Sequence, residues 1–184
     1  MPAWVIVLII LVVAFIIWAI KVQNKLVSTD EFCENSLSGI GVQQNSRWDA
    51  LNSLADLVKQ YDEHEYQSLM DIIAKRQPIS RNSTAAEVNN QENMLESAMS
   101  RFMAVSERYP ELKADKLYGQ TMDNVKEYEE NVRLARMTYN DSVTKYNRII
   151  RKFPSSFIAK RLSMKVRDYL ETENDVKAMP NLKR

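Results

Sequence analysis

A regular spacing of apolar and aromatic residues in the C-terminal half constrains the fold of this chain most. The residues recur at intervals of four, three, four and three positions, which is the spacing of a helix that packs against other helices. They are Tyr139, Val143, Tyr146, Ile150 and Phe153. The same face continues backwards through Arg136, Val132, Glu129, Val125, Met122 and Tyr118. The pattern predicts one helix of about ten turns from about Asp115 to Pro154, with partner helices along its length.

The composition favours an all-α protein. The chain has 184 residues and is 45% hydrophobic, which is enough for one bundle with an attachment. Only three glycines and five prolines are present, whereas a β-rich fold needs many turn residues. The formal charge of +1 gives no overall attraction to nucleic acid. The single Cys33 excludes an internal disulfide and a cysteine-rich zinc site.

The N-terminal segment reads as a membrane anchor. Residues 2–20 carry no charge and span about 28 Å as a helix, close to the hydrocarbon thickness of a bilayer. Trp4 and Trp18 lie near its two ends, where indole rings favour the headgroup region. A cleaved signal peptide is the competing interpretation. No Lys or Arg precedes the run and no small-residue cleavage site follows Ile20, so a retained anchor is preferred.

Positive charges next to the anchor predict its orientation. Lys21 and Lys25 follow the apolar run directly, whereas only the amino-terminal residue precedes it. The positive-inside rule then places the N-terminus outside and residues 21–184 in the cytoplasm, as a single-pass protein of the cell membrane.

Three further helical segments are expected between the anchor and the long helix. Residues 22–40 either continue the anchor or restart at a cap at Ser28, and Gly39 weakens the helix enough to predict a bend between Gly39 and Asn45. A helix is expected over residues 46–76, followed by a loop over residues 78–84.

Three local signals mark the boundaries of the later helices. Thr84 and Glu87 form a capping-box pattern that starts a helix. Pro110 ends that helix after Tyr109, because proline has no amide hydrogen to donate. Asp115 can cap the long helix that follows.

Two charged residues interrupt the apolar face of the long helix. Glu129 and Arg136 are seven residues apart and therefore on the same side. Either they meet partners on neighbouring helices, or they lie at the edge of the packed face and reach water. The expected partners are Glu65, Arg101 and Arg47.

No catalytic, cofactor-binding or metal site can be assembled from the residues. His64 is the only histidine, and position 68, where a zinc protease needs a second one, is Ser68. Ser142 and Lys145 have the spacing of some acyl enzymes, but no glycine-containing loop accompanies them to supply oxyanion donors. The chain is therefore expected to have no enzymatic activity and no cofactor.

Two Tyr-Asn pairs are the best candidates for a contact surface. As core residues, Tyr139 and Tyr146 would bury their rings, while Asn140 and Asn147 would flank the packed face. A groove beside them is also suited to receive a partner helix. The candidate interaction or structural residues are Glu65, Glu129, Arg136, Tyr139, Asn140, Tyr146, Asn147 and Phe153.

Several short motifs in a fixed order resemble those of the LemA family of bacterial membrane proteins. The motifs comprise residues 107–114, Glu129, Ala135, Arg136, Tyr139, Asn140, Val143, Tyr146, Asn147, Phe153, Pro154, Ile158 and Ala159. Arg47, Asp49, Tyr61, His64 and Glu65 agree as well, whereas a proline usual near Asn52 and a glycine usual near Gln60 are absent. The resemblance implies an N-out, single-span anchor with a cytoplasmic antiparallel bundle of three to four helices, and supplies no catalytic residue.

These observations predict three regions and a non-enzymatic role. Residues 1–20 form the transmembrane anchor, 21–165 the helical bundle and 166–184 a charged, mobile tail. The favoured function is a membrane-tethered scaffold or adaptor that binds an unidentified membrane or cytoplasmic protein, or a second copy of itself, with no nucleic acid involved. The alternative is a membrane-shaping or stress-response coiled-coil protein that engages lipid through Lys160, Arg161, Lys165 and Arg167.

Overall fold

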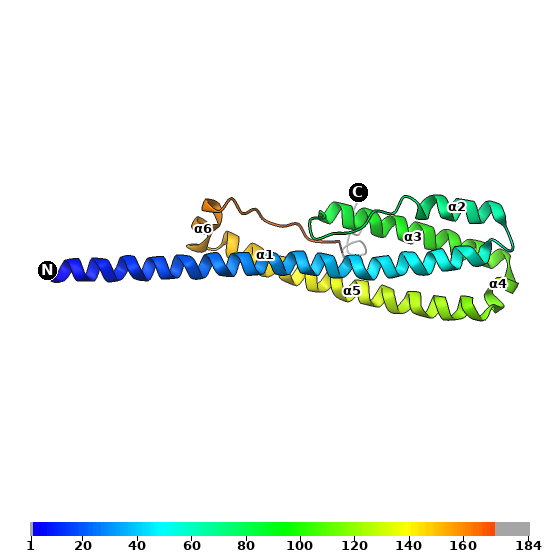
Figure 1. Ribbon diagram of the computed structural model, residues 1–184, viewed down its shortest axis with the longest axis horizontal. Helices are drawn as coiled ribbons and strands as arrows, with labels where there is room; N and C mark the ends of the chain where they lie inside the picture. The colour runs from blue at the N-terminus through cyan, green and yellow to red at the C-terminus, as the bar shows by residue number, and fades with distance from the viewer. Residues whose placement is uncertain (1, 172–184) are drawn as a thin grey trace, which may run out of the picture.

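The computed structural model describes residues 2–171 and confirms the all-helical prediction (Figure 1). No strand occurs among those residues. The helices are α1 (Ala3–Val58), α2 (Glu63–Ile73), α3 (Ala85–Arg108), α4 (Pro110–Ala114), α5 (Lys116–Arg151) and α6 (Ser155–Arg161).

The first helix, α1, runs without interruption for 56 residues. Its apolar N-terminal part is long and apolar enough to cross a membrane, with a mean hydropathy of 3.2 over 18 residues and none of that window buried. The predicted bend between Gly39 and Asn45 is therefore wrong, and no new helix begins at Ser28. Gly41 serves packing instead, because a Cβ atom there would lie 2.5 Å from the carbonyl oxygen of Ile79.

The helix predicted over residues 46–76 is also wrong, because the chain reverses within it. α1 ends at Val58 and α2 begins at Glu63. Asp62 caps α2 by accepting a hydrogen bond from the amide of Glu65 at 3.1 Å, and it also accepts one from the hydroxyl of Tyr109 at 2.9 Å. The reversal lets α2 fold back along the end of α1 (Figure 1).

Three other predicted helix boundaries are confirmed. Thr84 and Glu87 form both hydrogen bonds of a capping box at the start of α3. Pro110 follows the end of α3 and occupies the first position of the short α4. Asp115 caps α5 by accepting from the amide of Leu117 at 2.7 Å.

The long helices α1 and α5 lie side by side and run in opposite directions, while α2 and α3 cover α1 at the end far from the N-terminus (Figure 1). One apolar cluster fills that far end between α1, α2, α3, α4 and α5, and a second lies midway along α1, against the C-terminal third of α5. Tyr139, Val143 and Tyr146 are buried as predicted. Phe153 is 83% exposed, so its predicted packing is wrong: α5 ends at Arg151 and the helical periodicity stops there.

Candidate functional site

An extended segment that lies across α1 and α5 forms the candidate site. We call residues 163–171 the strap. α6 ends with Ser163 in the left-handed conformation (φ 56°), and the amides of Ser163 and Met164 bond back to the carbonyls of Lys160 and Ala159. This ending turns the chain so that the strap runs back along the bundle (Figure 1). Residues 166–171, which we placed in the tail, thus lie against the bundle, and the rest of the tail is outside the described residues.

Two asparagine side chains of α5 hold the backbone of the strap. Asn147 donates from Nδ2 to the carbonyl of Arg167 at 2.8 Å and accepts from the amide of the same residue at 2.9 Å. Asn140 does the same for Leu170, with both distances at 2.9 Å. A carboxamide carries one donor and one acceptor side by side, so each asparagine satisfies one whole residue of extended backbone. The seven-residue spacing of the asparagines matches residues three apart in the strap.

Neighbouring side chains of α5 add further contacts to the strap. The hydroxyl of Tyr139 donates to the carbonyl of Asp168 at 3.1 Å, and Arg136 donates to the carbonyl of Glu171. Thr144 bonds to the hydroxyl of Tyr169 at 3.3 Å. Because these bonds come from side chains, the strap is held without a strand partner.

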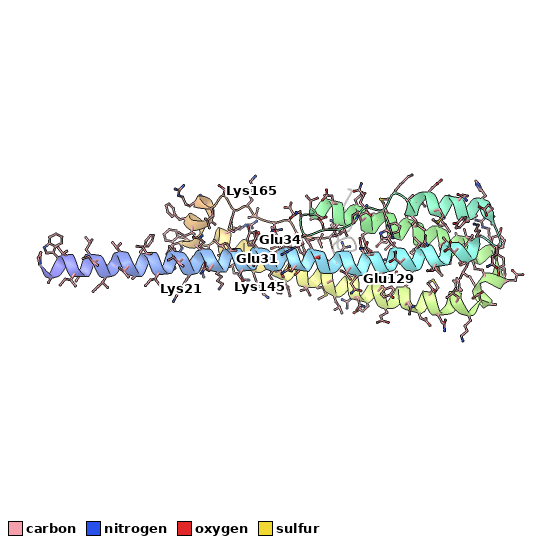
Figure 2. The ribbon with its side chains drawn as sticks, in the orientation of Figure 1. Lys21, Glu31, Glu34, Glu129, Lys145 and Lys165 are labelled. Carbon is pink, nitrogen blue, oxygen red and sulfur yellow. The ribbon has the colours of Figure 1, made fainter. Side chains whose placement is uncertain are left out.

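Arg167 fills an acidic recess on α1. Its Nε atom donates to Asp30 at 2.6 Å, an Nη atom donates to Glu34 at 3.2 Å, and its guanidinium lies 5.8 Å from the ring centre of Tyr146. Burial disfavours the charged guanidinium, but the hydrogen bond and charge of Asp30 outweigh that effect and raise the pKa of Arg167. Figure 2 marks Glu34 on α1. The recess therefore selects a cation.

Leu170 fills an apolar recess three residues further on. It is 1% exposed and belongs to the second apolar cluster. The other buried members are Cys33, Leu37, Ile40, Val88, Tyr139, Val143 and Tyr146. Burial raises the pKa of Cys33 to about 11 and that of Tyr146 to about 12. The strap thus reads as an extended Arg-x-x-Leu ligand, where x is any residue.

A buried charge network lies beside the end of the strap. Glu92 of α3 accepts from Arg47 and from Gln44, and it lies 3.3 Å from Arg136. Arg47 also meets Glu129 at 3.6 Å, as predicted, but the Glu129 side chain is 50% exposed and sits at the edge of the packed face. Arg136 has a partner that the prediction missed, Glu92. 

The remaining predicted partners bind one another at the far end of the bundle. Glu65 of α2 pairs with Arg101 at 3.2 Å and with Arg108, both on α3. The pKa of Glu65 is lowered mainly by the hydrogen bond from Arg108. These ion pairs join α2 to α3. Glu65 and Arg101 were expected to be partners of Glu129 and Arg136, and they pair with each other instead.

The structure does not bring the candidate chemical groups together. His64 lies exposed in the first turn of α2, and no three His, Cys, Asp or Glu side chains within residues 2–171 are placed to hold a metal ion. The hydroxyl of Ser142 is buried and donates to the carbonyl of Thr138. It is thus committed to its own helix.

Sequence reasoning identified the two Tyr-Asn pairs and missed what they bind. Asp30, Glu34 and Glu92 belong to the site and were not among its candidates. Arg167 was predicted to engage lipid and instead pairs with Asp30 and Glu34. One signal was available: two asparagines seven residues apart on a packed face present carboxamides that need backbone partners.

Two comparisons with known proteins bear on this arrangement. A comparison with curated proteins finds no match. The LemA family profile matches residues 36–183, which include the C-terminal part of α1, all of α5 and the strap. Because this match covers well over half of the chain, the protein belongs to the LemA family.

Proposed function

We propose that this protein is a membrane-anchored, non-enzymatic adaptor whose groove between α1 and α5 binds an extended Arg-x-x-Leu segment of a partner protein. The observation that carries the proposal is the pair of carboxamide clamps, Asn140 and Asn147, each of which holds both backbone groups of one strap residue. In the free protein the strap occupies the groove. A partner segment replaces it.

The groove combines backbone and side-chain recognition. The asparagines read extended backbone of any sequence, since they bond to amide and carbonyl groups alone. The recess of Asp30 and Glu34 adds a requirement for a cation, and the apolar recess around Leu170 adds one for a branched aliphatic side chain. These two positions have two residues between them, which fixes the spacing that a partner must present.

The strap is suited to exchange because a partner segment can make the same contacts, so that only the tether gives the strap an advantage. It follows α6 through residues that are not helical, and the groove bonds to its backbone with side chains. A tethered ligand has a high effective concentration, so a partner in trans binds weakly until the strap is weakened. Anchoring the partner in the same membrane would offset this competition in the same way.

A fluorescent peptide of residues 163–171 tests the groove directly. Full-length protein in detergent carries Arg167→Ala and Leu170→Ala, which weakens the strap. Fluorescence anisotropy should then show saturable binding, much tighter than to the wild-type protein. Adding Asn140→Ala and Asn147→Ala should abolish binding, whereas the exposed control Asp141→Ala should not change it.

The peptide itself provides the second control. Replacing its arginine or its leucine with alanine should each weaken binding at least about tenfold, because each loses a specific recess. Absence of binding to the weakened-strap variant, with helicity unchanged by circular dichroism, would refute the groove as a site for a segment in trans.

Photo-crosslinking then identifies the protein that supplies the bound segment. A photoreactive residue at Thr144, which borders the strap, is placed in full-length protein in native membranes. A captured protein counts as the partner only if a peptide containing its own Arg-x-x-Leu segment competes for the crosslink. Capture of a second copy through its residues 163–171 would identify self-association as the function of the groove.

A further inference from the structure

The corner between α5 and α6 exposes aromatic rings among basic residues. Phe153 is 83% exposed and Phe157 is 67% exposed. No Asp or Glu lies between Asp141 and Asp168, a stretch that contains Lys145, Arg148, Arg151, Lys152, Lys160, Arg161, Lys165 and Arg167. Large apolar rings that are exposed to water often mark an interaction site, and these two lie in the most basic part of the chain.

The fold places this corner next to the end of the apolar segment. α5 runs antiparallel to α1, so its C-terminal end lies toward the N-terminal half of α1 (Figure 1). α6 contacts α1, and Figure 2 places Lys21 close to the level of α6. Leu26 is the first residue of α1 to be buried, six positions after Ile20, which is about 9 Å along a helix. The headgroup layer on each side of a bilayer is about 5 to 8 Å thick.

We propose that the α5–α6 corner is a second membrane contact, in which Phe153 and Phe157 enter the headgroup region beside α1 while Lys152, Lys160 and Arg161 bind anionic lipid headgroups. Aromatic rings are stable at this depth and basic side chains favour a negatively charged surface. Arg167 is excluded from the set because Asp30 and Glu34 already bind it. The set of basic residues proposed to bind lipid is therefore smaller than the basic segment as a whole. The proposed lipid contact does not depend on the groove.

A depth measurement tests this contact in the full chain. Nitroxide labels are attached at Phe153→Cys, Phe157→Cys and, as a control, Val42→Cys, each in a Cys33→Ala background. Val42 is a 61% exposed apolar residue on α1, far from the apolar segment. The protein is reconstituted at one copy per nanodisc with phosphatidylglycerol, so that no second copy can cover the labels.

The expected result is a several-fold higher ratio of oxygen to nickel-complex collisions at positions 153 and 157 than at position 42. Lys152→Gln, Lys160→Gln and Arg161→Gln together, or a change to phosphatidylcholine, should lower that ratio. A water-like ratio at positions 153 and 157 in phosphatidylglycerol would overturn the contact. A high ratio that ignores both changes would overturn the recognition of anionic headgroups. The labelled positions are exposed, and circular dichroism checks that the fold is kept.

Discussion

At the scale of single residues, Glu92 holds together a buried polar layer. Its carboxylate bonds to Gln44 and Arg47 of α1 and lies 3.3 Å from Arg136 of α5. The side chains of Arg47, Glu92 and Arg136 are 5%, 11% and 13% exposed. Water solvates these two arginines poorly, so the charge of Glu92 stabilises them more than it would stabilise arginines at the surface.

Glu92→Ala should lower the free energy of unfolding by about 3 kcal/mol, because it leaves two largely buried guanidiniums beside each other without their shared carboxylate. Thermal unfolding of the full chain in detergent, followed by circular dichroism, measures the change. Glu130→Ala removes an exposed pair with Arg133 and should cause little change. Equal effects for the two variants would contradict the assignment of a buried network.

Cys33 reports on the strap, because both belong to the second apolar cluster and the chain has no other cysteine. Burial keeps the thiol protonated, with a pKa of about 11, so it should react slowly with maleimide. Leu170→Ala should speed labelling at least about tenfold, since loss of a buried leucine weakens packing by about 2 to 5 kcal/mol. Val166→Ala, at an exposed strap position, should leave the rate unchanged. Equal rates in all three proteins would mean that the strap does not protect the cluster.

At the scale of helices, the boundaries that were predicted are those with short-range hydrogen bonds. Thr84 and Asp115 cap helices through residues two or three positions away, so their sequence neighbourhoods are sufficient. The reversal before α2 follows the same logic: Asp62 and Glu65 carry the spacing of a cap and were overlooked because no Gly or Pro accompanies them. α1 stays straight past Gly39 while it packs along α5 and, at Gly41, against Ile79, and local sequence does not reveal these contacts.

Two glycines of α1 should respond in opposite directions to substitution by alanine. Gly39→Ala should stabilise the protein by about 1 kcal/mol, because alanine favours helix and nothing lies within 4 Å of the new Cβ atom. Gly41→Ala should destabilise it by about 1 to 3 kcal/mol, because the Cβ atom would meet the backbone of Ile79. Thermal unfolding of both variants decides the matter, and a stabilised Gly41→Ala protein would contradict the close packing.

The link between α2 and α3 should weaken in acid. The hydrogen bond from Arg108 is the largest cause of the lowered pKa of Glu65, burial opposes it, and Arg101 adds to the lowering. Folded protein therefore holds this proton less tightly than unfolded protein. The resulting stability is fully present above the ordinary pKa of 4.5 and is lost as the pH falls through the lower, folded-state value.

Glu65→Gln should flatten the acid side of the stability profile, measured by thermal unfolding between about pH 3 and 7. Replacing Arg101 and Arg108 together with glutamine should flatten it in the same way, because the carboxylate then loses the partners that lower its pKa. A Glu65→Gln protein that keeps the full wild-type slope would show that this carboxylate is not responsible.

At the scale of the whole molecule, the site is made by contacts that join distant parts of the chain. Arg167 and Asp30 are 137 residues apart, and Asn147 and Arg167 are 20 apart. Periodicity places Asn140 and Asn147 at the edge of a packed face, yet it cannot say which segment crosses that face. The all-helical fold was therefore predictable from repeated local patterns, whereas the groove and its occupant needed the three-dimensional structure.

The proposed orientation in the membrane can be tested on whole bacterial cells. In a Cys33→Ala background, Ala3→Cys should react with a membrane-impermeant maleimide in intact cells, because Lys21 and Lys25 favour the cytoplasmic side. Gln120→Cys, at an exposed position of α5, should react only after the membrane is permeabilised. The reverse pattern would place the bundle outside and exclude a cytoplasmic partner.

The uninterrupted course of α1 has a mechanical consequence. If residues 2–20 cross the bilayer, the same helix continues from Lys21 to Val58, about 57 Å at the rise of an α-helix, without a hinge. A transmembrane helix changes its tilt when the bilayer thickens or thins. A change of about 10° would swing the far end of such a rod by about 10 Å, so that α1 would act as a lever that converts membrane thickness into displacement far from the bilayer.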